Sequence, residues 1–121
     1  LLDVTASAWP AAPDRFDAVY CANLLHIAPW AACAALMQGA AARLRPGGAL
    51  LLYGPYVIDG LATAPSNLAF DADLRARDAR WGLRRLADVV AAAAHCGLAS
   101  EQRIAMPANN LLLVFRAASA A

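Results

Sequence analysis

Residues 16–54 constrain the fold more than any other part of the chain, because their pattern indicates a strand, a loop, a helix, a turn and a second strand. The apolar run Phe16–Ala22 suits a strand buried on both faces, and the run at residues 49–53 suits another. This spacing predicts a right-handed β-α-β unit. We therefore expect the strand around Val19 and the strand around Leu51 to lie side by side and run in the same direction.

The helix between these strands is predicted from its two ends and its apolar positions. Pro29 suits a first helical turn, because its fixed φ is already helical. Arg43 and Arg45 fall in the last turn, where cations favour the helix dipole, and the glycines after Pro46 end the helix. One apolar stripe at helical spacing can cover a sheet: Cys33, Leu36, Met37, Ala40, Ala41 and Leu44.

The segment after the second strand has a long connection followed by a helix. Residues 54–67 contain glycine and prolines without periodicity, and connections of this length in compact domains are often functional covers. The next pattern predicts a helix within residues 68–78, with Leu68, Leu74 and Phe70 turned inward.

The last part of the chain predicts one more helix and a hairpin. Residues 85–96 form an apolar helical pattern that ends at Gly97, a residue suited to a left-handed cap. Residues 101–106 and 110–116 indicate two antiparallel strands. With a further strand at residues 1–4, these elements predict an α/β fold with a mostly parallel sheet and a terminal antiparallel hairpin.

Length and composition narrow the classes of partner. With 121 residues, of which 61% are hydrophobic, the chain suits one domain, residues 1–121. Its formal charge of +1 is too small to attract nucleic acid or anionic membranes, and the arginines between Arg75 and Arg85 alternate with acids as a solvated face does. No spacing suits a metal, the cysteines suggest reduced core residues, and no signal or membrane segment is evident, so we expect a cytoplasmic protein.

Two groups of residues follow the ends of the central strands. Ligands of open α/β sheets bind beyond the carboxyl ends of the strands, so residues 23–26 and 54–56 should share one rim. His26 is the side chain there that titrates near neutral pH, which makes it a candidate general base. The alternative is a hydrogen-bonded loop histidine without a catalytic role.

Several segments spread along the chain carry a resemblance to a known family. They are CANLLHIAPW at residues 21–30, LLYGPYVIDG at residues 51–60, PSN at residues 65–67, the pair Trp81-Gly82, and MPANN at residues 106–110. Together with the LRPGG turn at residues 44–48, they resemble the carboxyl-terminal part of the methyltransferase-like domain of unknown function 938. That family resembles the class I S-adenosylmethionine-dependent methyltransferases, which have a Rossmann-like sheet.

The resemblance implies a cofactor and a set of site residues. The cofactor would be S-adenosylmethionine, bound by Asp3, Val4, Asn23 and Leu24, although Asp3 and Asn23 also suit ordinary turns. The methyl acceptor would be a small molecule. Its implied contacts are Trp30, Tyr56, Asn67, Asn109 and Asn110, for which core packing or turn formation is the alternative reading.

One departure from the family pattern shapes the functional expectation. The chain starts at Leu1 without Met, and it lacks the first two strands of the superfamily's sheet and the Gly-rich cofactor loop. We therefore expect the carboxyl-terminal portion of a domain of about two hundred residues. The expected function is methyl transfer by an incomplete half, and the alternative is a non-catalytic α/β interaction module.

Overall fold

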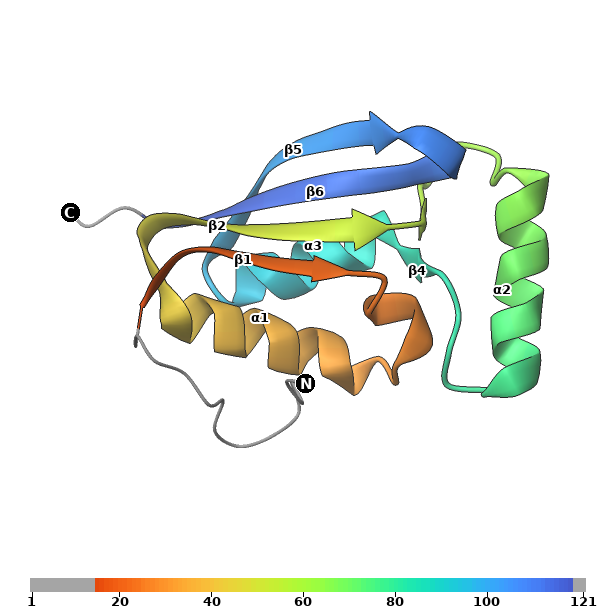
Figure 1. The fold of residues 1–121 in the computed structure, drawn as a ribbon, viewed down its shortest axis with the longest axis horizontal. Helices are drawn as coiled ribbons and strands as arrows, with labels where there is room; N and C mark the ends of the chain where they lie inside the picture. Colours follow the sequence, from red (N-terminus) through yellow and green to blue (C-terminus); the bar gives the residue numbers. More distant parts are fainter. Residues whose placement is uncertain (1–14, 119–121) are drawn as a thin grey trace.

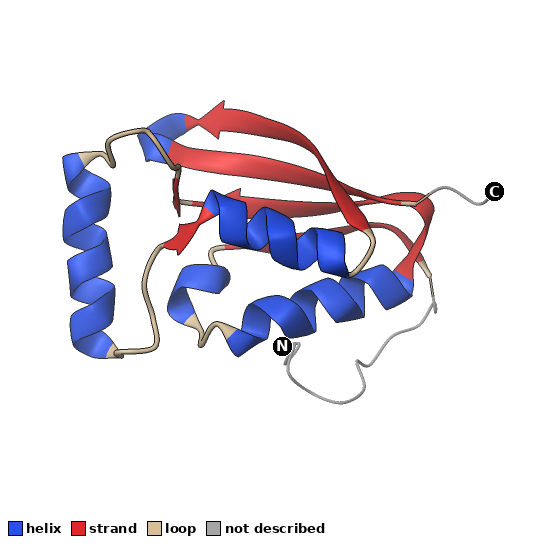
Figure 2. Ribbon diagram, turned by 180° about the vertical axis from the view of Figure 1, so that it is seen from behind, coloured by secondary structure: helices blue, strands red, loops and turns tan. Residues whose placement is uncertain are grey.

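The computed structural model describes residues 15–118, and their centre is a four-stranded sheet with the order β1-β2-β6-β5 (Figure 1). The strands are β1 (Phe16–Ala22), β2 (Leu44–Gly54), β5 (Leu98–Met106) and β6 (Asn110–Ala117). Helices α1 (Ala31–Arg43) and α3 (Leu86–His95) pack together on one face, as Figure 2 shows from behind. Within residues 15–118, no helix covers the opposite face. The strand expected at residues 1–4, with Asp3 and Val4, lies outside the described residues.

The predicted parallel pairing of the two central strands is confirmed. Val19 of β1 lies opposite Leu50 of β2, and Tyr20 lies opposite Leu51, with the strands running in the same direction. The expectation that β1 is buried on both faces is wrong, because Tyr20 is 62% exposed. Among the residues described, β1 pairs with β2 alone and no helix covers its second face, so alternate side chains reach solvent.

The LRPGG segment has a structural role inside β2, which begins at Leu44 rather than at residue 49. Phe16 pairs with Leu44 and Ala18 pairs with Ala49, so residues 45–48 form a bulge in the pairing. A Cβ on Gly48 would lie 2.9 Å from the carbonyl oxygen of Arg45 and 3.0 Å from that of Asp17, closer than side-chain carbons come to backbone oxygens. A glycine is therefore required for the strands to approach here.

The prediction of a mostly parallel sheet is wrong. β1 and β2 are parallel, but β6 is antiparallel to both β2 and β5. The reason is the position of β6. It lies between β2 and β5, which run in the same direction, and so separates two strands that would otherwise pair in parallel. The described residues form a mixed sheet, and the predicted antiparallel hairpin of β5 and β6 is confirmed.

Helices α1 and α3 form the core layer as the sequence predicts. The buried face of α1 consists of Ala32, Cys33, Leu36, Met37 and Ala40. α3 buries Leu86, Val89 and Ala93 and is followed by Gly97, whose φ of +81° is the expected left-handed conformation. These side chains meet Leu50, Leu52, Leu113 and Phe115 from the sheet, and the three cysteines are free.

Helix α2 (Pro65–Arg77) behaves differently from the sequence prediction. It starts before residue 68, stands beyond one end of the strands and turns Leu74 inward, where it is 3% exposed. Leu68 and Phe70 were expected to point inward, but they are 57% and 39% exposed because α2 does not lie on the sheet. Two short strands that the sequence did not predict, β3 (Tyr56–Val57) and β4 (Arg84–Arg85), pair in parallel beside α2. No helix in the described range is both long and apolar enough to span a bilayer.

Candidate functional site

The carboxyl ends of β1 and β2 meet at one rim, as the sequence predicts. Asn23, which follows β1, has a φ of +56°, and its backbone N–H donates a 2.8 Å hydrogen bond to the carbonyl oxygen of Tyr53. A Cβ built on Gly54 would lie 3.7 Å from Asn23 Oδ1 and 3.7 Å from the Nδ1 and Cε1 atoms of His26. Asn23, His26 and Gly54 therefore converge at this rim.

His26 lies in the one-turn helix η1 (Leu25–Ile27) and is buried, with 5% of its surface exposed. Its ring contacts the ring of Phe70 of α2 edge to face, with 5.5 Å between centroids. Burial, and then the positive charge of Arg84, lower the pKa of His26 below its ordinary value of 6.5. The imidazole is therefore neutral at neutral pH, the state in which it can accept a proton.

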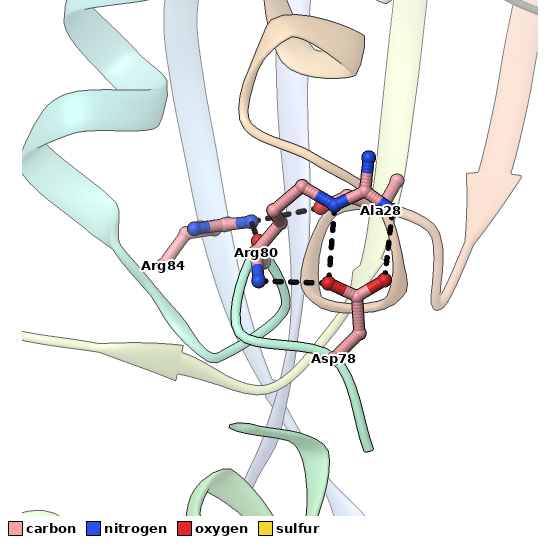
Figure 3. A network of polar contacts seen from close by, with 4 residues as sticks. All are labelled: Ala28, Asp78, Arg80 and Arg84. Carbon is pink, nitrogen blue, oxygen red and sulfur yellow. Dashed lines mark hydrogen bonds and ion pairs between the residues drawn. The ribbon is translucent and has the colours of Figure 1, made fainter. Parts of the chain in front are cut away.

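Arg84 holds η1 in place through backbone carbonyl groups (Figure 3). Its Nε donates to the carbonyl oxygen of Leu25 at 3.0 Å, and its Nη2 donates to those of Ala28 at 2.8 Å and Arg80 at 2.7 Å. Arg80 is itself paired with Asp78 at 2.9 Å. The expectation that the arginines of this region form a solvated face is right for Arg80 and wrong for Arg84, which is half-buried. Nothing in the residue pattern distinguished the two.

Trp30 and Leu24 lie near η1 rather than in a common binding wall. Trp30 is 41% exposed, and the guanidinium of Arg84 lies over its ring at 5.5 Å from the centroid. Leu24 is half-buried and packs against the core. The structure therefore places Trp30 apart from the other residues expected to bind the acceptor.

Those other residues line one pocket of about 280 Å³. Tyr56, Asn67, Asn109 and Asn110 come from β3, α2, the short helix η2 (Pro107–Asn109) and β6. The remaining lining residues are Ile58, Leu61, Ala62, Thr63, Ala64, Ala105, Met106 and Leu111. Leu111 lies opposite Gly54 in the sheet, so the pocket adjoins the rim that holds Asn23 and His26.

The asparagines of this pocket are positioned by hydrogen bonds to the backbone. Asn67 is 9% exposed, and its Nδ2 donates to the carbonyl oxygen of Asn109 at 3.2 Å, which joins α2 to the tip of the hairpin. Ala108 and Asn109 both have positive φ, 62° and 60°, a conformation that Asn adopts more readily than Ala. Burial raises the pKa of Tyr56, so its hydroxyl stays neutral.

Residues 15–118 contain no group of three or more His, Cys, Asp or Glu side chains that could hold a metal ion. The site within this range is built from amides, one imidazole, one phenol, the hydroxyl of Thr63 and apolar side chains. These groups can orient a small ligand and accept a proton.

A family model described as "Protein of unknown function (DUF938)" matches residues 1–117. The chain belongs to that family. The match covers all the segments that carried the resemblance in the sequence, including the rim and the pocket of this DUF938 protein.

Solved structures with the same fold are methyltransferases. An O-methyltransferase family 2 protein from Planctomyces limnophilus, in complex with apigenin, is 20% identical, with a TM-score of 0.79 over 94% of this chain and 32% of the other. An O-methyltransferase family protein from Burkholderia thailandensis is 20% identical, with a TM-score of 0.75 over 91% of this chain and 32% of the other. Human N-acetylserotonin methyltransferase, in complex with SAM, is 14% identical, with a TM-score of 0.75 over 85% and 30%.

These likenesses establish the fold of the DUF938 protein. It has a methyltransferase-like α/β fold with a mixed sheet, and the chain spans about a third of the length of each of these three proteins. At identities of 20% or less, the likeness does not extend to residue roles.

Proposed function

We propose that the DUF938 protein transfers a methyl group from S-adenosylmethionine to a small-molecule acceptor. The observation that carries this proposal is the rim where Asn23, His26 and Gly54 meet at the carboxyl ends of two parallel strands. Ligands of open α/β sheets bind at such rims. Solved structures with this fold, one in complex with SAM and one with apigenin, support the choice of reaction.

The residues at the rim suit the cofactor. When bound, S-adenosylmethionine supplies a methyl group on a sulfonium, which a nucleophile displaces directly. A Cβ on Gly54 would be in ordinary contact, at 3.7 Å, with Asn23 Oδ1 and with His26, so these three residues face one another at the rim. Asn23 and Leu24 would contact the cofactor there, with Asp3 and Val4 as further contacts outside the described residues. We propose that its remaining contacts, including those of a Gly-rich loop, come from outside this chain.

The neighbouring residues suit the acceptor. The acceptor would contact the pocket through Tyr56, Asn67, Asn109 and Asn110. The imidazole of His26 would take the proton that the acceptor hydroxyl or amine loses, because its lowered pKa keeps it neutral. Positioning supplies the rest of the catalysis, since displacement needs the nucleophile and the methyl group in line.

The test is a titration of the full-length gene product with S-adenosylmethionine, in which NMR measures cofactor binding. S-adenosylmethionine should shift the backbone amide signals of Asn23, Leu24 and Gly54 in a saturable way. Asn23→Gly keeps the positive φ and removes only the side chain, so it should weaken binding about tenfold. Asn109→Gly is the matched control, because Asn109 has the same backbone conformation in the pocket, and it should bind the cofactor as the wild type does. Saturation without shifts at the rim, or no saturable binding, would contradict the proposal.

A non-catalytic interaction module is the second candidate, and the edge of β1 favours it. Within residues 15–118 this edge has no partner strand, and Tyr20 is exposed there. The same titration distinguishes the two functions. A module would leave the rim signals unchanged at every cofactor concentration, and a Tyr20→Lys change would disrupt its binding to a partner chain. An enzyme would bind the cofactor with or without this change.

A further inference from the structure

The pocket beside α2 is lined without a single charged side chain. Its walls are apolar or aromatic except for Thr63, Asn67, Asn109 and Asn110. A carboxylate, phosphate or ammonium ion that enters such a pocket loses its hydration and gains no opposite charge, which is strongly unfavourable. The lining therefore selects against charged ligands.

The side-chain amides of Asn67 and Asn110 are used in the same way, with the Nδ2 atom of each donating to a backbone carbonyl oxygen. The Nδ2 of Asn67 donates to Asn109, and the Nδ2 of Asn110 donates to the carbonyl oxygen of Pro107 at 3.3 Å. Within the part of the chain that the structure describes, no residue donates a hydrogen bond to the Oδ1 atoms of Asn67 and Asn110. These oxygens remain available as acceptors, and a ligand that satisfies them must be a hydrogen-bond donor.

We infer that this pocket binds an uncharged small molecule with an apolar body and a hydroxyl or N–H group, which donates to the Oδ1 atoms of Asn67 and Asn110. This inference rests on the proposed function for the role of that molecule as the methyl acceptor. The volume of about 280 Å³ is at the small end of ligand sites, so the apolar body is one or two rings or an equivalent chain. Tyr56, Met106 and Leu111 supply the surface against which it packs.

Three probes of similar shape test separately whether the pocket requires a hydrogen-bond donor and whether it excludes charge. All three are used with the unmodified protein. Phenol has a donor and no charge, anisole has neither donor nor charge, and benzoate has a charge and no donor. The measurement is NMR at neutral pH, with the side-chain amide signals of Asn67, Asn109 and Asn110 as the readout. We expect phenol to shift these signals saturably and to bind at least about tenfold more tightly than anisole or benzoate, because a site built to accept a hydrogen bond rejects analogues that lack the donor.

A variant checks the location of the effect. Asn67→Ala removes one acceptor oxygen and should abolish most of the preference for phenol over anisole, whereas Asn23→Gly, at the rim, should leave it unchanged. Equal binding of phenol and anisole, tighter binding of benzoate, shifts confined to other residues, or no saturable binding of any probe would overturn the inference.

The same experiment distinguishes this inference from the proposed function. Phenol binds without the cofactor, so its preference over anisole and benzoate tests the pocket alone. If phenol selectivity is present and S-adenosylmethionine fails to bind at the rim, the methyl-transfer proposal fails while the ligand class of the pocket stands. If the cofactor binds and the probe series shows no selectivity, the inferred ligand class fails while the methyl-transfer proposal stands.

Discussion

Helices α1 and α2 each have 13 residues, but they differ in how much of their surface is buried and in what they contact. α1 buries five side chains against the sheet, whereas α2 buries only Asn67 and Leu74 and exposes Leu68 and Phe70. α2 carries two ion pairs between side chains one turn apart, and three contacts attach it to other elements: Asn67 to Asn109, Phe70 to His26, and Asp71 to Leu83. The comparison indicates that α1 builds the scaffold and that α2 serves the pocket and the rim.

The largest expected effect tests this comparison with one substitution in each helix. Leu36 of α1 and Leu74 of α2 are 2% and 3% exposed, so Leu→Ala removes the same atoms from equally buried positions. We expect Leu36→Ala to lower the free energy of unfolding by about 4 kcal/mol, because it leaves a cavity in the main core, and Leu74→Ala to lower it by about 2 kcal/mol. Urea unfolding measures both values.

Amide hydrogen exchange shows which part of the molecule each substitution destabilises. Leu74→Ala should speed amide exchange in residues 65–77 while β2 and β6 stay protected, and Leu36→Ala should speed exchange throughout the sheet. Equal losses of stability, with equal exchange in the two regions, would show that α2 is as much a part of the scaffold as α1.

The second effect concerns the segment that joins α2 to the rim. Arg84→Met removes the donors to three backbone carbonyl groups, and we expect it to lower the free energy of unfolding by about 2–3 kcal/mol. The neighbouring Arg85→Met is the matched control, because Arg85 is exposed and its ion pairs with described residues are to the surface acids Asp59 and Asp88. Its urea midpoint should equal that of the wild type. A similar loss in both variants would remove the assigned role of Arg84.

The third effect compares two acids of α2 that each pair with an arginine one turn later. Asp71 also accepts a 2.8 Å hydrogen bond from the backbone N–H of Leu83, whereas Asp73 accepts none from another element among residues 15–118. Asp71→Ala should lower the free energy of unfolding by about 1–2 kcal/mol, because the Leu83 N–H loses its acceptor. Asp73→Ala should change it by less than about 0.5 kcal/mol. The reverse order in thermal or urea unfolding would contradict the attachment of α2 through Asp71.

The smallest effect is a pH dependence from His26, where α2 and the rim meet. Burial and the charge of Arg84 lower its pKa from the ordinary 6.5, so the unfolded chain takes up a proton at a higher pH than the folded protein does. Its contribution to stability is therefore complete above about pH 6.5 and is lost as the pH falls toward the lowered pKa. His26→Gln should flatten the change in urea midpoint between about pH 7 and pH 5. An unchanged slope in His26→Gln would contradict the lowered pKa.

The sequence predicts the elements better than their arrangement. The bounds of β1, the apolar stripe of α1 from Cys33 to Ala40, the cap at Gly97 and the β5–β6 hairpin follow from local patterns, and the structure confirms them. The end of α1 was predicted too late, because Leu44 and Arg45 belong to β2. The prediction of a mostly parallel sheet was wrong because the relative directions of the strands depend on the neighbours of β6. Those neighbours, β2 and β5, are set by long-range contacts. Phe70 was placed inward for a similar reason, since helical spacing reveals a face but not what lies opposite that face.

The candidate site shows the same division. Tyr56, Asn67, Asn109 and Asn110 were expected from loops near the carboxyl rim, and the structure brings all four to one pocket, although their role in binding stays a prediction. Arg84 could not be found in the sequence, because its partners are backbone carbonyl groups at Leu25, Ala28 and Arg80, and backbone groups leave no trace in residue identity.

The place of β6 in the sheet has a consequence for biosynthesis. β6 follows β1, β2 and β5 in the chain, yet it occupies an interior position between β2 and β5 and contributes Phe115, which is fully buried. The unit of β1, α1 and β2 thus leaves the exit tunnel with the β6 side of β2 unpaired, and it stays so until residue 117 has emerged. During translation the free side of β2 is therefore exposed to pairing with other chains until β6 has been made.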